Sequence, residues 1–296
     1  MFKGSMVALV TPFKDGRLDE ETLRKLVAFH IKNKTSALVP CGTTGESATL
    51  SLAEHERVIE LVVESAAKRV PVIAGAGSNN TTEAIRLTKH AKEAGADAVL
   101  LISPYYNKPT QKGLYLHFRK IAESVDIPIV LYNIAARTAV NINPETVAQL
   151  AHDCPNIVAI KEASGSLEQM ATIKMLCPKN FALLSGDDAL LLPVLSIGGA
   201  GVISVVANIV PHDTARIVEE FDKGNLAKAQ ALFFRLLPLV KAMFLETNPI
   251  PVKTAMEMLG MCSPGLRLPL CPMNEGNVTA LHEALVAYGL LKGKSK

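Results

Sequence analysis

The sequence predicts an α/β fold, a (β/α)8 TIM barrel with a C-terminal helical appendage. Eight short apolar runs recur at intervals of about 20 to 35 residues, the length of a strand–helix–strand step. Signals for the start of an amphipathic helix lie between these runs. Hydrophobic residues make up 49% of the 296 residues and aromatic residues only 5%, which is typical of an aliphatic parallel sheet covered by helices. We expect the catalytic barrel over residues 1–223 and the helical region over residues 224–296.

The apolar runs define the expected strands, and the helix signals separate them. In chain order the strands are Ser5–Val10, Ala37–Pro40, Val72–Ala74, Ala98–Ile102, Ile129–Tyr132, Ile157–Lys161, Ala182–Ser185 and Val202–Ser204. The helix signals are Asp19, Ser51 with Glu54, Asn143-Pro144, Ser166 with Gln169, and Pro211, followed by helical stretches at Leu226–Phe244, Pro251–Leu259 and Val278–Tyr288. An open doubly wound sheet is the alternative, but no GxGxxG follows the first run.

Charge and composition exclude several classes of function. The 31 Lys and Arg nearly balance the 28 Asp and Glu, so we expect no nucleic-acid partner. The five cysteines are scattered without a CxxC pair, which favours free thiols in a reducing cytoplasm over a disulfide framework. The seven histidines show no metal-ligand spacing, so we expect no metal. The first apolar run is too short for a signal segment or a membrane span.

The run Ile157–Lys161 is the most informative stretch because a buried strand ends in a lysine. A free ammonium in this position is costly, so it either pairs with a carboxylate or loses its proton readily to become a nucleophilic amine. The first of these interpretations describes an ordinary lysine that points to water. In a barrel, however, catalytic residues gather where the strands end, and this placement favours a catalytic Lys161.

Other strand ends carry polar side chains. Thr43 and Thr44 lie between two glycines after the second strand and could hold a small anion, or could simply cap the next helix. The fifth strand ends in Tyr132, which can transfer protons. Arg137 follows, and its guanidinium group can donate two parallel hydrogen bonds to a carboxylate. Together with Lys161, these residues describe a Schiff-base enzyme for a small keto acid.

Three other functions remain open at this stage. A different acceptor would make the chain a sialate or keto-sugar-acid aldolase, in which hydroxyl partners should replace Arg137. A barrel hydrolase would need two inward carboxylates among Glu46, Glu162 and Asp187. Adjacent strand residues face opposite sides, so we assign Glu162 no role beside Lys161. A barrel that only senses pyruvate is the last alternative.

The motifs resemble those of the dihydrodipicolinate synthase family, within the pyruvate-dependent lyase superfamily that includes N-acetylneuraminate lyase. The resemblance covers essentially the whole chain, and the Arg137-Thr138 pair favours this branch over the sialic-acid lyases. The matching stretches are residues 42–47, Pro104-Tyr105-Tyr106, Tyr132-Asn133 with Arg137-Thr138, residues 160–163, 184–188, 201–204, 248–253 and 266–269.

The resemblance implies a condensation of pyruvate with L-aspartate 4-semialdehyde in lysine and diaminopimelate biosynthesis. It implies an imine on Lys161, a proton relay through Thr43, Tyr132 and a Tyr106 from a neighbouring subunit, and Arg137 on the semialdehyde carboxylate. The other implied substrate-binding residues are Thr44, Gly186 and Ile203. The family resemblance also implies a homotetramer built as a dimer of dimers, without cofactor or metal.

Two stretches depart from the family pattern. Ala135-Ala136 replaces a common proline and Ala139 a common glycine, which should loosen the loop that carries Arg137. A candidate lysine-feedback site resembles the family's, although Leu52 stands where some inhibited members have histidine. The candidate feedback residues are Ser47, Ala48, His55, Asn79, Glu83 and Tyr105.

Overall fold

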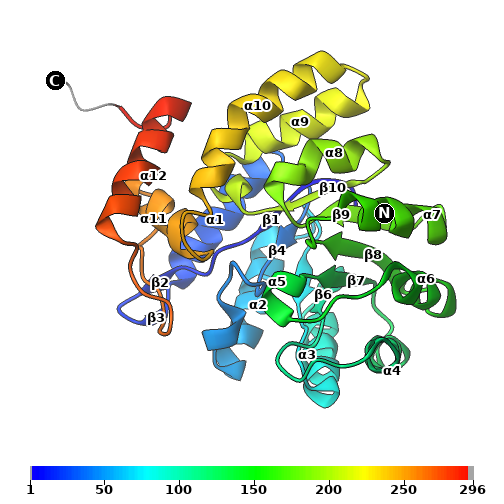
Figure 1. Ribbon diagram of the computed structural model, residues 1–296. Helices are drawn as coiled ribbons and strands as arrows, with labels where there is room; N and C mark the ends of the chain where they lie inside the picture. Colours follow the sequence, from blue (N-terminus) through cyan, green and yellow to red (C-terminus); the bar gives the residue numbers. More distant parts are fainter. Residues whose placement is uncertain (1, 293–296) are drawn as a thin grey trace.

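The computed structural model describes residues 2–292 and confirms the (β/α)8 barrel (Figure 1). The eight barrel strands are all parallel and are hydrogen-bonded in the order β4-β1-β10-β9-β8-β7-β6-β5. A bridge between Leu38 and Val72 joins the two ends of this order and closes the barrel. The strands are β1 Gly4–Ala8, β4 Leu38–Val39, β5 Ile73–Gly75, β6 Ala98–Ile102, β7 Ile129–Asn133, β8 Ile157–Glu162, β9 Ala182–Ser185 and β10 Gly201–Ser204.

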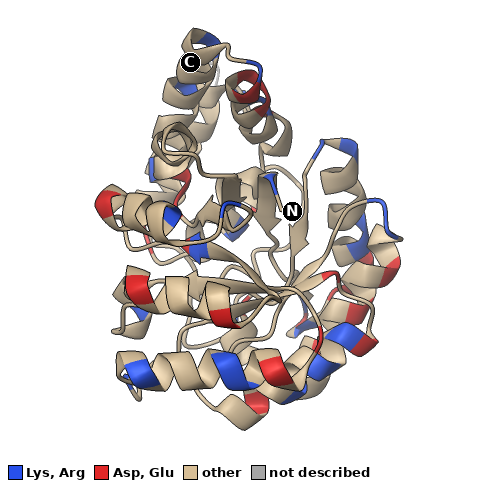
Figure 2. Ribbon diagram, turned by 90° about the vertical axis from the view of Figure 1, so that its right-hand side faces the viewer, with Lys and Arg blue, Asp and Glu red and all other residues tan. Residues whose placement is uncertain are grey.

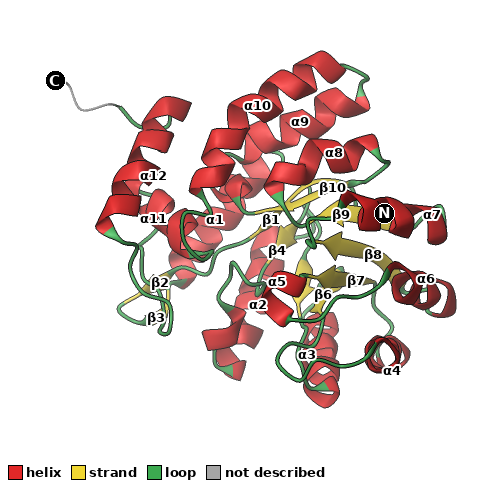
Figure 3. Cartoon of the chain, in the orientation of Figure 1, coloured by secondary structure: helices red, strands yellow, loops and turns green. Residues whose placement is uncertain are grey.

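Helices form the outer layer of the barrel, and helices and strands separate clearly in Figure 3. The main helices of this layer are α1 Glu20–Lys32, α2 Leu52–Ala66, α3 Thr81–Glu93, α4 Gln111–Ser124, α6 Pro144–Asp153, α7 Leu167–Leu176, α8 Leu191–Ser196 and α9 Pro211–Asp222. The expected start signals are confirmed. Asp19 caps α1, Ser51 and Glu54 form a capping box on α2, and Ser166 caps α7.

Two hydrophobic clusters follow from the alternation of side chains along the strands. The inner cluster fills the barrel with residues such as Met6, Leu100, Ala159, Leu184 and Ile203. The outer cluster lies between strands and helices and is far larger. Because Ala159 faces the inner cluster, the residue two positions on, Lys161, faces inward too, whereas Glu162 faces the helices.

Three helices follow the barrel at the C-terminal end, as expected from the sequence. They are α10 Leu226–Ala242, α11 Ile250–Met258 and α12 Glu275–Tyr288, each within a few residues of the predicted range. Helix α10 packs along α9 and α12, so this region lies against the barrel (Figure 1). Acidic and basic residues are interspersed along the outer helices in Figure 2. Within residues 2–292, no helix is long and apolar enough to cross a membrane.

The expectation for the first strand was wrong in its bounds, and a hairpin was missed. The first strand ends at Ala8, and the chain then forms a two-stranded hairpin of β2 Phe13–Lys14 and β3 Arg17–Leu18. The turn between them, Asp15-Gly16, has positive φ at both positions. An Asp-Gly pair is the usual signal of such a turn, but two-residue strands are too short to show an alternating pattern.

The packing of α1 predicts a stability that depends on pH. His30 is fully buried, its Nδ1 lies 3.0 Å from Thr35 Oγ1, and burial lowers its pKa to about 3. The unfolded chain therefore binds more protons below about pH 6.5, and stability should fall as the pH drops from 6.5 towards 3. Between pH 6.5 and 5 we expect a loss of about 1–2 kcal/mol from this residue. Urea midpoints at both pH values should show a shallower dependence for His30→Asn, and an equal slope would contradict the assignment.

Candidate active site

Lys161 and Tyr132 lie side by side at the ends of β8 and β7. The parallel register pairs these two residues, and both side chains are over 90% buried. The Lys161 Nζ lies 4.3 Å from the centroid of the Tyr132 ring, within the range of a cation–π contact. Among the described residues, no carboxylate lies within ion-pair distance of Lys161. The structure therefore contradicts the ordinary interpretation, in which Lys161 pairs with a carboxylate and points to water.

Gly186 follows β9 and lies against the same lysine. A Cβ at this position would lie 3.2 Å from Lys161 Cε and 2.6 Å from Ala163 Cβ. Only glycine lets the backbone approach the lysine this closely. Ile203 on β10 is fully buried in the inner cluster. The turn that follows β10 is held by Asp188, whose carboxylate accepts hydrogen bonds from Val205 N and Val206 N. Burial raises the pKa of this carboxyl group.

The turn after β4 brings Thr43 and Thr44 to the mouth of the barrel. Cys41 and Glu46 both adopt positive φ, so the chain reverses tightly around Gly42–Gly45. Thr44 is 2% exposed, and its Oγ1 accepts a hydrogen bond of 3.0 Å from Asn248 Nδ2. Burial raises the pKa of the Cys41 thiol, which fits an inert thiol rather than a nucleophile.

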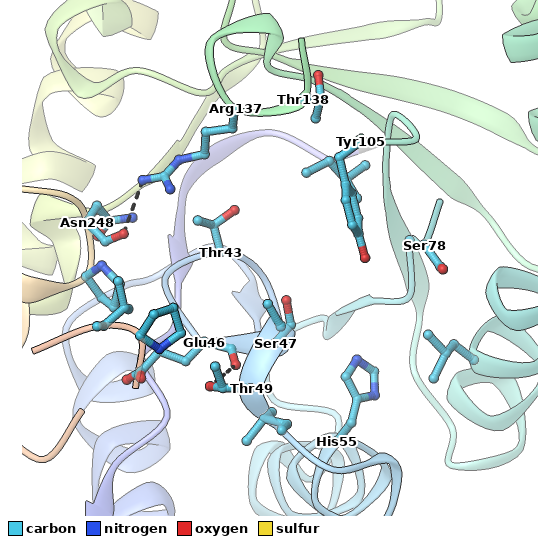
Figure 4. Close-up of a pocket in the computed structure, with 18 of the residues that line it drawn as sticks. Thr43, Glu46, Ser47, Thr49, His55, Ser78, Tyr105, Arg137, Thr138 and Asn248 are labelled. Carbon is cyan, nitrogen blue, oxygen red and sulfur yellow. Dashed lines mark hydrogen bonds between the residues drawn. The ribbon is translucent and has the colours of Figure 1, made fainter. Parts of the chain in front are cut away.

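Arg137 reaches the same region from a short helix, α5 Ala135–Thr138. Its Nη2 donates a hydrogen bond of 3.1 Å to the Asn248 main-chain oxygen (Figure 4). Ala139 ends this helix in the left-handed region at φ 59°, where the absence of a Cβ would relieve about 1–2 kcal/mol of strain. This conformation explains why glycine suits the position.

A cavity of about 460 Å³ extends from these residues toward α2 and α3 (Figure 4). Thr43, Arg137 and Asn248 line one part of it, and the candidate feedback residues line another, namely Ser47, Ala48, His55, Glu83 and Tyr105. Asn79 is not part of this lining, but its side chain donates to the Tyr105 main-chain oxygen at 3.1 Å. Lys161 and Tyr132 also lie outside the lining, deeper in the barrel.

The two adjacent tyrosines differ in environment. Tyr105 is 40% exposed and lines the cavity, whereas Tyr106 is 91% exposed and does not. Tyr106 also has positive φ (70°), which is uncommon for a bulky residue. The structure of one chain therefore does not bring Tyr106 together with Lys161.

The carboxylates considered for a hydrolase do not form an inward pair. Glu162 faces the helices and accepts from Asn133, Ser164 and Gln169. Glu46 is bound by Lys253 at 2.6 Å, with both side chains fully buried. Asp187 caps the 3₁₀ turn after β9 by accepting from Ala189 N. The geometry thus argues against the hydrolase interpretation.

Sequence reasoning missed the contribution of the segment after α10. Asn248 contacts both Thr44 and Arg137, and Lys253 and Arg267 hold Glu46 through its two carboxylate oxygens. These residues appeared only within stretches that resembled the family. The sequence offered no local signal for their role, because each contact spans more than 100 residues.

Fold and site together define a (β/α)8-barrel enzyme with a lysine and a tyrosine in contact at its centre. Comparison with known proteins gives the family. Residues 1–288 match the model of the dihydrodipicolinate synthetase family, and the chain belongs to it. The 4-hydroxy-tetrahydrodipicolinate synthase of Syntrophobacter fumaroxidans is 60% identical over 292 residues, which cover 98% of this chain and all of the relative.

Solved structures agree with this family. The dihydrodipicolinate synthase of Aquifex aeolicus superposes with a TM-score of 0.97 at 50% identity, covering 99% of this chain and 100% of that one. A protein described as the first monomeric dihydrodipicolinate synthase variant superposes with a TM-score of 0.96 at 44% identity, covering 98% of each chain. This likeness confirms the family that the sequence motifs predicted.

Proposed function

We propose that this chain is a 4-hydroxy-tetrahydrodipicolinate synthase, which condenses pyruvate with L-aspartate 4-semialdehyde in lysine and diaminopimelate biosynthesis. The observation that carries the proposal is the buried Lys161, which contacts Tyr132 and has no carboxylate partner among the described residues. Whole-length relatives with this activity support the choice of substrates. No step of this chemistry needs a metal or a cofactor.

The reaction begins at the Lys161 amine. The amine attacks the pyruvate ketone, one water leaves, and an imine forms. Loss of a methyl proton gives the enamine, whose carbon attacks the aldehyde of the second substrate. The amine of that substrate then attacks the imine carbon, which closes the ring and releases Lys161. In this scheme Tyr132 and Thr43 carry protons between the lysine and solvent, and Tyr106 from a second subunit completes the relay.

The substrate carboxylates have separate partners in this proposal. Thr43 and Thr44 hold the pyruvate carboxylate, with Thr44 fixed by Asn248, and the backbone at Gly186 and Ile203 borders the pocket. Arg137 holds the carboxylate of the semialdehyde through its guanidinium fork. The Arg137 side chain already lies at the cavity, anchored to the Asn248 carbonyl.

Oligomerisation is part of the proposal. Tyr106 at 91% exposure is poorly placed to act in its own barrel and well placed to act in another. That a relative was described as the first monomeric variant supports oligomers as the family's usual state. We propose a homotetramer, a dimer of dimers. We also propose a cytoplasmic location, which the five free cysteines support.

Lysine feedback is proposed for the part of the cavity that His55, Glu83 and Tyr105 line. The Glu83 carboxylate, which accepts from Ser78 Oγ, offers a partner for an amino group. Because this part and the Arg137 part belong to one cavity, an effector bound there would lie close to the substrate site.

Borohydride trapping tests the proposed function. With pyruvate, reduction should leave an N-carboxyethyl group on the peptide that contains Lys161, while the peptide of the fully buried Lys253 should stay unmodified. Aspartate semialdehyde should then give a condensation product by mass spectrometry, and N-acetylmannosamine should give none. An absent adduct, or an adduct on another lysine, would refute the Schiff-base mechanism. Product from the sugar alone would favour the sialate aldolase.

A further inference from the structure

We infer that Asn141 is a positioning residue for the second-substrate site, acting through a partly buried network that holds both ends of the loop carrying Arg137. The network consists of Asn133, Asn141, Glu162 and Gln169, and we call it the outer network because it lies on the helix-facing side of β7 and β8. The inference rests on the proposed function of Arg137 and deepens it.

Every polar group of the outer network has a partner. The Asn133 Nδ2 donates to Asn141 Oδ1 at 2.7 Å and to Glu162 Oε2 at 2.9 Å. The Gln169 Nε2 donates to the same two oxygens at 3.1 Å each. In return Asn141 Nδ2 donates to Gln169 Oε1 at 2.9 Å. A polar network whose groups are all satisfied in this way makes the structure around it more rigid.

Glu162 anchors this network to the strand that ends in Lys161. Its side chain is fully buried and also accepts from Ser164 N at 2.6 Å. Hydrogen bonds to an ionised carboxylate are stronger than those between neutral groups. The carboxylate therefore serves as the fixed point on which Asn133 and Gln169 converge, and its role is structural rather than catalytic.

The outer network closes the loop that contains Arg137. Residues 134–140 run from Asn133 to Asn141, and the hydrogen bond between these two side chains fixes the ends of the loop. Asn133 Oδ1 also accepts from Ile142 N at 3.0 Å. Because Ala135-Ala136 lacks the stiffening proline expected from the family, the chain needs another restraint here. The bonds of Asn141 supply that restraint.

Asn141 can be separated from the rest of the machinery. Loss of its side chain leaves the Asn133–Glu162 hydrogen bond, so the strand ends that carry Tyr132 and Lys161 keep their connection. What is lost is the tie that the Asn141 side chain makes to Asn133 and Gln169, while the main chain around it keeps its bonds to Asn133 and Gln111. The effect should therefore fall on the semialdehyde and not on pyruvate.

The test compares Asn141→Ala with two other variants. We expect a rise of about 10- to 100-fold in KM for aspartate semialdehyde, with pyruvate KM and borohydride trapping within about twofold of wild type. Asn143→Ala is the matched control, because this exposed neighbour loses only a 3.3 Å contact to Asn141. In an Arg137→Ala background, Asn141→Ala should add little, because both changes act on one group.

Three outcomes would overturn the inference. They are an unchanged semialdehyde KM, an equal loss for both substrates, and full additivity with Arg137→Ala. Pyruvate trapping reports whether Asn141→Ala is folded. If it is not, Asn141→Asp, which keeps the acceptor for Asn133, should show the same selective rise with smaller magnitude. Failure of the proposed function would be visible separately, as absent trapping or absent product in the wild-type protein.

Discussion

Replacement of Lys161 by alanine should reduce kcat/KM by at least about 10³-fold, comparable to other losses of a covalent nucleophile. The reason is geometric, since the amine that attacks pyruvate lies in the barrel against Tyr132, a contact that no other lysine of residues 2–292 makes. Lys253, also buried, is engaged with Glu46. Steady-state condensation and borohydride trapping should both be lost, with the exposed Lys179→Ala as the control.

The same variant should keep its fold, and its stability separates two interpretations of the lysine. A buried ammonium without a carboxylate partner is unfavourable, so its removal should leave the melting temperature unchanged or higher. If Lys161 were an ordinary structural residue, alanine would lower the melting temperature and leave activity measurable. Condensation above a thousandth of the wild-type rate would contradict the proposed role.

The sequence predicted the barrel because its evidence is local and repeated. The range Ala98–Ile102 agrees with β6 at both ends, and Ser51 with Glu54 forms the predicted capping box. The sequence could predict that Lys161 and Tyr132 lie near each other, because the strand ends share one face of a barrel. In the structure the strand register places Lys161 directly beside Tyr132, so the amine contacts the ring. The spacing of the two residues along the chain could not predict this contact.

Long-range contacts were not predictable in this way. Asn248 meets Thr44 across 204 positions, and Lys253 meets Glu46 across 207. A lysine on an amphipathic helix ordinarily faces water, and nothing in residues 250–258 indicates a buried charge. Asn141 carried no local signal either, because its partners Asn133 and Gln169 lie on β7 and α7. The cavity could not be predicted from the sequence either, because residues from six or more separate segments line it.

The ion pair between Glu46 and Lys253 should have the largest effect on stability. Both side chains are fully buried, and Lys253 Nζ also donates to Thr11 O at 3.0 Å and to Gly265 O. Glu46→Ala leaves this ammonium without its counter-charge and should destabilise the fold by about 3–5 kcal/mol in urea unfolding. It should also loosen the turn that holds Thr43 and Thr44, because the Glu46 carboxylate ties this turn to Lys253 Nζ and Arg267 N.

Two further measurements identify the cause as an unpaired charge. Burial already lowers the pKa of Lys253, and loss of Glu46 should lower it further. The unfolded chain then binds more protons than the folded one between this lowered pKa and about 10.5, so stability must rise with pH in that window. The loss of stability in Glu46→Ala should therefore be smaller at pH 9 than at pH 7.

The double variant Glu46→Ala with Lys253→Met should recover much of the lost stability, since replacement of a buried ion pair by apolar groups is often neutral. A deficit independent of pH, or a double variant as unstable as the sum of the single ones, would mean that the turn depends on packing at Glu46 and not on its charge.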